Sequence, residues 1–178
     1  MGTVSLFEPE RLVIALLYRP DFELGSLASE LDGRFGKAEF LGTELPFTWT
    51  DYYGPEMGPG LRRCFCSFGR LIDPSELADI KLWTNGLEER LSFGGKRTVN
   101  LDPGFLSLGR FCLATTKDRS HRIPLGRGIY AELTLIYEAG DWRPLPWTYA
   151  DWRSPEYRAV LTGLRERYKA ERRTGFKR

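Results

Sequence analysis

The chain has 178 residues, of which 42% are hydrophobic and 28% charged, and its formal net charge is +2. No apolar run approaches the roughly 20 residues of a membrane span, so the composition excludes a transmembrane protein and fits one folded domain. Acidic residues precede the first apolar run, which is the wrong order for a signal peptide. We therefore expect a cytoplasmic protein without a membrane partner.

The cysteine and histidine content argues against a zinc site. The chain has three cysteines and one histidine, too few sulfur and nitrogen ligands for zinc. Cys64 and Cys66 flank Phe65 in a predicted strand, so both side chains point to one face. A thiol metal pair and two small buried hydrophobic residues both fit this spacing, and we favour the second interpretation. No haem or flavin signature is present.

Apolar periodicity predicts the order βαββαβ for the first part of the chain. Short apolar runs predict strands at residues 11–19, 37–47, 61–72 and 96–101. A first helix is expected to begin at an Asp21 N-cap and to end at Gly36. A second helix begins with Asp-Pro-Ser-Glu at residues 73–76, which is close to a capping box. This order is that of the split βαβ, ferredoxin-like arrangement.

The second part of the chain predicts a helix, a β-meander and a final helix. Asp102 is followed by proline, as Asp73 is, and this repeated dipeptide predicts a short third helix. Residues 121–147 read as an antiparallel meander, whose middle strand places Leu133 and Leu135 on one face. A helix is expected from about Ser154 to the end of the chain.

We expect one α+β domain over residues 1–178. Its ferredoxin-like core spans residues 1–101, and a helix, an antiparallel meander and a C-terminal helix extend it over residues 102–178.

No strong catalytic motif is present. The chain lacks the phosphate loop, the dinucleotide-binding glycine pattern, the nucleophile elbow and the H-E-x-x-H metal motif. Thr-Thr-Lys-Asp at residues 115–118 is similar to a guanine-reading pattern of GTPases, but it lacks the intervening residue. Candidate functional residues are therefore polar and aromatic groups at the ends of elements.

The first candidate group is Asp51, Tyr52, Tyr53 and Glu56, in a loop between two strands. Tyrosines in such a loop can stack on a planar ligand, while carboxylates hold a cation or ribose hydroxyls. A turn with its tyrosines packed on the core explains the same residues.

The second candidate group is Lys117, Asp118, His121 and Arg122. His121 follows an acid by three residues, so it is a candidate general base oriented by Asp118. Capping the last carbonyls of the preceding predicted helix is an equally good explanation.

The third candidate group lies on the second predicted helix. Lys81, Asn85 and Glu88 share a face opposite the leucines, and Trp83 is nearby. A solvated helix face is the default interpretation, and a ligand-binding stripe is the alternative.

Glu132 is a carboxylate in the middle of an apolar strand. The simplest interpretation is that Glu132 lies on the solvent-exposed face of a sheet whose other face is buried. If Glu132 is buried it needs a partner, for which Arg122 and Arg127 are placed across the hairpin. If it faces a cleft, it is a candidate acid, base or cation ligand.

Four stretches of the chain carry a family resemblance. They are LPFTWTDYYGPEMGPGLRRCFCSFGRLIDPSELADIKLWTN, VNLDPGFLS, LATTKDRSHRIPLGRGIYAELTLIY and PLPWTYADWRSPEY, of which TDYY followed by EMG is the most specific piece. They resemble the uncharacterised prokaryotic family catalogued as domain of unknown function 4416. The resemblance implies that the candidate loop, helix and junction belong to one family pattern, and it implies no activity.

The leading hypothesis is a site for a small, nucleotide-like phosphorylated ligand, open to Mg²⁺-assisted enzyme chemistry. Asp51, Glu56 and Glu132 would hold Mg²⁺, since carboxylates suit a hard cation. The phosphate would be neutralised by Lys81, Lys117 and Arg122. His121 would move the proton.

Two other classes of function are kept as alternatives. An RNA-binding module would use the predicted sheet and the basic C-terminal helix, where residues 158–178 carry eight basic and two acidic residues. A protein-interaction domain would use exposed Trp147 and Trp152 to dock a partner. The sequence leaves the homo-oligomeric state open.

Overall fold

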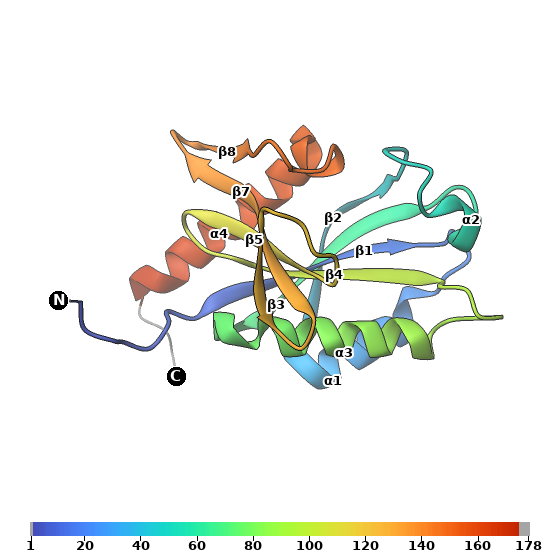
Figure 1. Ribbon diagram of the computed structural model, residues 1–178, viewed down its shortest axis with the longest axis horizontal. Helices are drawn as coiled ribbons and strands as arrows, with labels where there is room; N and C mark the ends of the chain where they lie inside the picture. The colour runs from blue at the N-terminus through green and yellow to red at the C-terminus, as the bar shows by residue number, and fades with distance from the viewer. Residues whose placement is uncertain (1, 175–178) are drawn as a thin grey trace.

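The computed structural model describes residues 2–174, and its strands form one antiparallel sheet (Figure 1). The strands are β1 (Glu10–Tyr18), β2 (Ala38–Pro46), β3 (Arg62–Ile72), β4 (Val99–Leu106), β5 (Arg110–Thr115), β6 (Arg122–Gly126), β7 (Ile129–Glu138) and β8 (Asp141–Pro144). Within the described residues these eight strands follow the order β2-β3-β1-β4-β5-β7-β6, and β8 pairs with β7.

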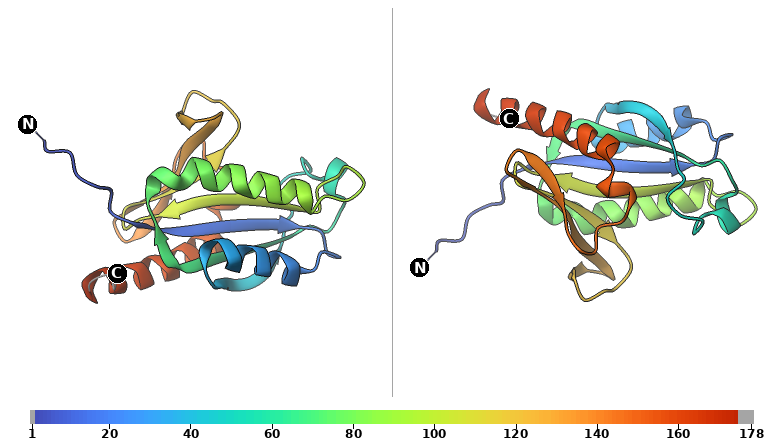
Figure 2. Two further views of the ribbon diagram at one scale, coloured as in Figure 1. Left: turned by 90° about the horizontal axis from the view of Figure 1, so that it is seen from below. Right: turned by 90° about the horizontal axis from the view of Figure 1, so that it is seen from above.

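Helices cover both faces of the sheet. They are α1 (Leu24–Phe35), α2 (Gly54–Met57), α3 (Leu77–Arg90) and α4 (Pro155–Thr174), with two short 3₁₀ helices, η1 (Pro74–Glu76) and η2 (Asp151–Arg153). Helices α1 and α3 lie on one side of the sheet and α4 lies on the other (Figure 2). The fold is therefore α+β, an open antiparallel sheet with a C-terminal helix.

Strand β1 lies in the middle of the sheet and is buried on both faces. Its even-numbered residues, such as Leu12 and Ile14, pack towards α1 and α3. Its odd-numbered residues Val13 and Ala15 pack in the cluster that contains Leu161 of α4. Because both faces are covered, the strand reads as a continuous apolar run, as the sequence predicted.

The two helix starts predicted from aspartates have different outcomes. Asp73 forms the predicted capping box, because its carboxylate accepts from the Ser75 N–H and Glu76 accepts from the Asp73 N–H. The predicted Asp21 cap is wrong. Helix α1 begins at Leu24, and the Asp21 carboxylate instead accepts two hydrogen bonds from the Arg19 guanidinium.

The predicted helix after Asp102 is also wrong. Asp102 lies inside β4, and the residues after it form the β4–β5 hairpin. All residues of β4 except Asp102 are buried, and β4 pairs with β1 along its length. A one-faced helix would leave part of this apolar sequence in water, whereas a strand beside β1 buries both faces.

The predicted meander is present, but its middle strand changes face once. The pairing of β5 with β7 shifts between Phe111, which faces Leu135, and Cys112, which faces Leu133. Leu133 consequently packs in the core on the α1–α3 side, and Leu135 packs in the core on the α4 side. The prediction that both leucines share a face is wrong because a β-bulge breaks the two-residue alternation.

The three cysteines are buried and form no disulfide within the described residues, in agreement with the interpretation as small hydrophobic residues. Burial raises the pKa of the Cys64 thiol to about 11 and that of Cys112 to about 12. Among the described residues, no helix combines the length and the apolar character that crossing a membrane requires.

Candidate functional site

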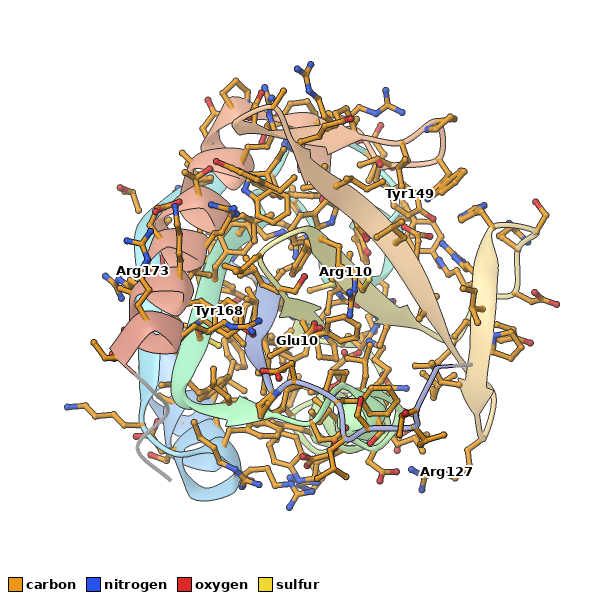
Figure 3. All side chains as sticks on the ribbon, turned by 90° about the vertical axis from the view of Figure 1, so that its left-hand side faces the viewer. Glu10, Arg110, Arg127, Tyr149, Tyr168 and Arg173 are labelled. Carbon is orange, nitrogen blue, oxygen red and sulfur yellow. The ribbon has the colours of Figure 1, made fainter. Side chains whose placement is uncertain are left out.

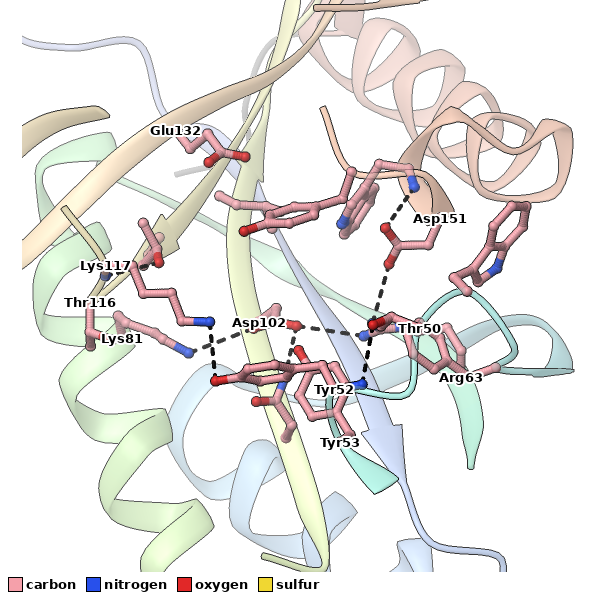
Figure 4. Close-up of a pocket in the computed structure, with 18 of the residues that line it drawn as sticks. Thr50, Tyr52, Tyr53, Arg63, Lys81, Asp102, Thr116, Lys117, Glu132 and Asp151 are labelled. Atoms are coloured by element: carbon pink, nitrogen blue, oxygen red, sulfur yellow. Dashed lines mark hydrogen bonds and ion pairs between the residues drawn. The ribbon is translucent and has the colours of Figure 1, made fainter. Parts of the chain in front are cut away.

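A cavity of about 530 Å³ opens where several distant parts of the chain meet (Figure 4). The segments that line it are the loop after β2, the start of β3, helix α3, the loop into β4 with the first half of that strand, the end of β5 with the loop into β6 and the first residue of β6, one residue of β7, and η2 with the loop before it. Six cationic side chains line it, namely Arg63, Lys81, Arg97, Lys117, Arg119 and Arg122. Four carboxylates line it as well, namely Glu88, Asp102, Glu132 and Asp151. Six positive charges against four negative ones leave the cavity cationic.

Arg63 lies buried in the cavity wall with an exposed fraction of 2%. Its guanidinium lies between two carboxylates, with Nη1 3.6 Å from Asp102 and Nη2 3.5 Å from Asp151. Its Nη1 makes no hydrogen bond to any residue in the described range. At 3.6 Å the Asp102 oxygen is too far to accept a good hydrogen bond, so a buried donor is left free beside the cavity.

Lys81 brings a second buried cation from α3. Its Nζ donates to the Leu101 carbonyl over 2.7 Å and lies 3.8 Å from Asp102 and 3.9 Å from Glu88. Glu88 in turn accepts from the Leu101 N–H. Burial raises the pKa of Glu88, and it also raises the pKa of Asp151.

Arg97 joins the TDYY loop to the cavity wall. Its guanidinium donates to both Glu56 oxygens, from Nε over 2.8 Å and from Nη2 over 2.7 Å. It also donates to Asn100 over 2.7 Å and lies over the Tyr53 ring. The hydrogen bonds from Arg97 hold the pKa of Glu56 below its usual range.

Glu132 is buried, with an exposed fraction of 2%, and it lines the cavity. Its Oε2 accepts from Arg122 Nε over 2.7 Å and lies 2.6 Å from Arg122 Nη2. His121 Nε2 lies 3.1 Å from the same oxygen, and the His121 ring stacks on Trp147. The structure therefore gives Glu132 the predicted partner Arg122 and excludes the solvent-exposed interpretation.

Aromatic side chains surround the mouth of the cavity. Trp49, Tyr52 and Tyr149 line it while remaining 45%, 61% and 55% exposed. Lys117 reaches across from the loop after β5, and its Nζ lies 4.5 Å from the centre of the Tyr52 ring (Figure 4). Flat apolar surface is thus available beside the charged groups.

The cavity brings together residues from all three predicted groups and Glu132. Those that line it are Tyr52, Tyr53, Lys81, Asn85, Glu88, Lys117, Arg122 and Glu132. The interpretation of Lys81 and Glu88 as a solvated helix face is wrong, because both side chains are buried.

Four predicted residues do not line the cavity, namely Asp51, Glu56, Asp118 and His121. Glu56 lies behind Arg97, and His121 lies behind Glu132. The predicted pairing of His121 with Asp118 is wrong, since the histidine contacts Glu132. The helix that His121 was expected to cap is a strand, β5.

The carboxylates expected to hold Mg²⁺ are not gathered at one point. Glu56 is paired with Arg97 and Glu132 with Arg122, while Asp51 is exposed and does not line the cavity. Over residues 2–174, no group of three or more His, Cys, Asp or Glu side chains is arranged to hold a metal ion. A role for Mg²⁺ stays a prediction.

Four charged residues of the lining were not predicted as site residues from the sequence, namely Arg63, Arg97, Asp102 and Asp151. Arg63 interrupts an apolar strand as Glu132 does, so the same signal could have identified it. Asp102 was assigned to a helix cap. Nothing local distinguishes Arg97 or Asp151 from ordinary surface residues.

The two alternative functions rest on features that the structure also describes. Trp152 is buried, so it is not the exposed ring that a docking role assumes. Trp147 is partly buried, and its Nε1 donates to the Leu133 carbonyl.

The RNA-binding alternative depends on the basic helix α4. Two of its arginines, Arg158 and Arg167, pair with Asp141 and Glu39. Part of the basic stretch, residues 175–178, lies outside the described residues, and RNA binding stays a prediction.

Helix α4 also contacts the segment at the start of β1, where Glu10, Arg110 and Tyr168 lie close together (Figure 3). The Tyr168 hydroxyl donates to the Pro9 carbonyl, and Arg110 donates to Glu10 over 2.6 Å. These contacts involve residues that lie outside the cavity lining.

Comparison with known proteins gives one match. The sequence model of the family described as "Domain of unknown function (DUF4416)" matches residues 8–168. No curated protein and no solved structure matches the chain.

Proposed function

Because the chain belongs to the DUF4416 family, whose description assigns no activity, we propose its function from the cavity: it binds a small phosphorylated, nucleotide-like molecule there. The volume of about 530 Å³ is in the range of small-molecule sites. The excess of cations favours an anionic ligand, and the aromatic mouth favours a planar part.

The observation that carries this proposal is the gathering of six cationic side chains against four carboxylates around one cavity. A guanidinium matches the geometry of phosphate oxygens. Arg63 lies buried beside Asp102 in the cavity wall, where its charge attracts an anion. Lys81 lies near the same Asp102 carboxylate and adds positive charge there.

Lys117 and Arg119 extend this cationic surface towards the mouth. Both side chains are exposed, and each lines the cavity. The Arg119 guanidinium donates to the carbonyl of Asp118, its neighbour in sequence, and Lys117 contacts Tyr52. Neither residue supports the buried core, so both can be removed with little effect on folding.

The test is isothermal titration calorimetry with AMP, GMP, ATP, ribose 5-phosphate and inorganic phosphate, with and without Mg²⁺. We expect micromolar to millimolar binding of at least one organic phosphate and weaker binding of inorganic phosphate. The double variant Lys117→Ala/Arg119→Ala should weaken binding about 10-fold or more, since hydrogen bonds to charged groups contribute about 1.5–3 kcal/mol each.

A matched control removes two cations outside the cavity. Arg70→Ala/Arg143→Ala makes the same change in net charge, and both of its side chains are exposed and absent from the cavity lining. Equal weakening by the two double variants would mean that only the overall charge matters. That result, or no binding of any organic phosphate by a cooperatively folded protein, would refute the proposed function.

We also propose that residues 10–106 form a ferredoxin-like core of the split βαβ kind. The support is the strand order β2-β3-β1-β4, with β1 antiparallel to both of its neighbours and with α1 and α3 in the two crossover connections. An experimental structure in which β1 pairs with other strands would contradict it.

A further inference from the structure

Glu132 has one occupied and one free carboxylate oxygen. Every hydrogen bond or ion pair of its carboxylate within residues 2–174, from Arg122 and from His121, reaches Oε2. No described residue donates to Oε1, and this oxygen is not among the buried atoms that lack a partner, so it is accessible. Since Glu132 lines the cavity, Oε1 is an acceptor available to a ligand.

The position of this oxygen is fixed by its neighbours. Arg122 donates from Nη1 to the Lys117 carbonyl, which holds the guanidinium in place while it binds Glu132. His121 is held from the other side by its stack on Trp147, with ring centroids 4.9 Å apart. A carboxylate held in this way loses little freedom when a ligand binds to it.

The charge of Glu132 selects the kind of partner. Arg122 already compensates the carboxylate at the short distances given above, so a second cation beside it would meet a neutralised pair. A neutral N–H is not repelled by the Arg122 charge, and it gains a charge-assisted hydrogen bond to the carboxylate. The site therefore favours an uncharged donor over a metal ion or an ammonium group.

A planar surface lies next to this acceptor. The Tyr149 hydroxyl is 3.4 Å from Arg122 Nη2, and its ring lines the cavity while remaining 55% exposed. An exposed aromatic face and a carboxylate acceptor in one cavity fit a heteroaromatic ring, which stacks through its face and donates through its edge.

We propose that Glu132 Oε1 accepts a hydrogen bond from an N–H on the heteroaromatic ring of the ligand, with Arg122 and His121 as positioning residues. This inference rests on the proposed function and adds to it the part of the ligand that is recognised. It makes the protein selective for bases that carry a donor.

The experiment compares purine riboside 5′-monophosphate, whose base has no N–H, with AMP, IMP and GMP, whose bases have one or more. All four carry the same ribose phosphate, so differences in dissociation constant report on the base. We expect at least one of the three donor-bearing nucleotides to bind about 10- to 100-fold more tightly than purine riboside 5′-monophosphate.

The variant Glu132→Gln should remove this preference. Its amide oxygen must stay on the donors of Arg122, which turns the amide NH₂ towards the cavity and replaces an acceptor with a donor. The affinity ratio should then fall to about 1 or below. Glu138→Gln is the control, because it makes the same change at an exposed position of the same strand, away from the cavity.

Equal affinities of the four nucleotides for the unmodified protein would overturn this inference and leave the proposed function standing. An affinity ratio that persists in folded Glu132→Gln would overturn it as well. If none of the four binds, the proposed function fails together with the inference. Should Glu132→Gln not fold, the comparison of ligands on the unmodified protein decides alone.

Discussion

Arg122 and Glu132 form an ion pair that is almost fully removed from water, with exposed fractions of 8% and 2%. Such a pair adds little stability compared with an apolar pair, because desolvation offsets most of the attraction. Removing one partner is different, since the other charge then stays buried without compensation. The pair therefore makes both residues hard to replace singly.

We predict that Arg122→Met lowers the free energy of unfolding by about 3–5 kcal/mol, the range for one broken buried pair. Adding Glu132→Gln to that variant should restore a large part of the loss, because the buried charge is then gone. Urea unfolding followed by circular dichroism measures both. Arg143→Met, at an exposed position, is the control, and an equal loss in it would contradict the prediction.

Single residues show where sequence reasoning succeeds and where it stops. A charge inside an apolar strand is visible in the sequence, which is why Glu132 was identified. Arg63 has the same signal and was overlooked. Arg97 and Asp151 carry no such signal, since their importance comes from the loops that bring them to the cavity.

At the scale of elements, β4 and β5 approach each other closely at Gly104. A Cβ at this position would lie 2.4 Å from the Cys112 carbonyl oxygen and 3.1 Å from side-chain atoms of Phe111 and Leu113. The backbone oxygen cannot move without disturbing the β4–β5 pairing. Glycine is required here because of close packing, and its φ is not in the left-handed region.

We predict that Gly104→Ala destabilises the protein by about 1–3 kcal/mol, as overpacking in a core does. Gly109→Ala is the matched control in the turn of the same hairpin, where a Cβ would meet nothing within 4 Å. Thermal unfolding of the two variants should separate them clearly. Similar melting temperatures would show that the two strands can move apart at little cost.

The capping box at the start of η1 and α3 predicts a pH dependence. Hydrogen bonds from the Ser75 hydroxyl and N–H lower the pKa of Asp73. A lowered folded pKa means that the stabilisation is complete above the unfolded value of about 3.9 and is lost as the pH falls through the folded value.

Asp73→Ala should therefore be less stable than the unmodified protein at pH 7, and the difference should shrink as the pH falls below about 3.9. Urea midpoints measured between pH 7 and pH 3 test this. The control is Asp118→Ala, which removes an exposed carboxylate without a cap. A difference that stays constant with pH would contradict a charged cap.

The two Asp-Pro dipeptides show why one predicted helix is present and the other is not. After Asp73 come Glu76 and leucines at helical spacing, and a helix forms. The dipeptide Asp102-Pro103 is followed by glycine and by residues that are buried on both faces, and a strand forms beside β1. The bulge opposite Cys112 likewise depends on the neighbouring strand, which local periodicity does not report.

At the scale of the whole molecule, the cavity exists because distant loops meet. Lys117 and Tyr52 are 65 residues apart in sequence and in contact across the mouth. A minority of the lining residues were predicted from the sequence, each of them singly, and their meeting depends on the order of strands in the sheet. Such convergence lies in tertiary structure alone.

We predict that binding of the tightest nucleotide slows amide hydrogen exchange in three loops, at residues 47–53, 115–122 and 148–151. Each loop contributes residues to the cavity, and a ligand that bridges them reduces their opening. Helix α1 contributes none and serves as the internal control. Slowing that is uniform over the chain, measured by mass spectrometry, would indicate general stabilisation without a localised site.

The central position of β1 has a consequence for synthesis of the protein. Its neighbours β3 and β4 end at Ile72 and Leu106, so β1 leaves the ribosome long before either partner is complete. During that interval its six central residues, which are fully buried in the finished sheet, have no partner strand to cover them. Pairing over such sequence separations is slow. The nascent chain therefore presents an apolar segment that a ribosome-associated chaperone would recognise.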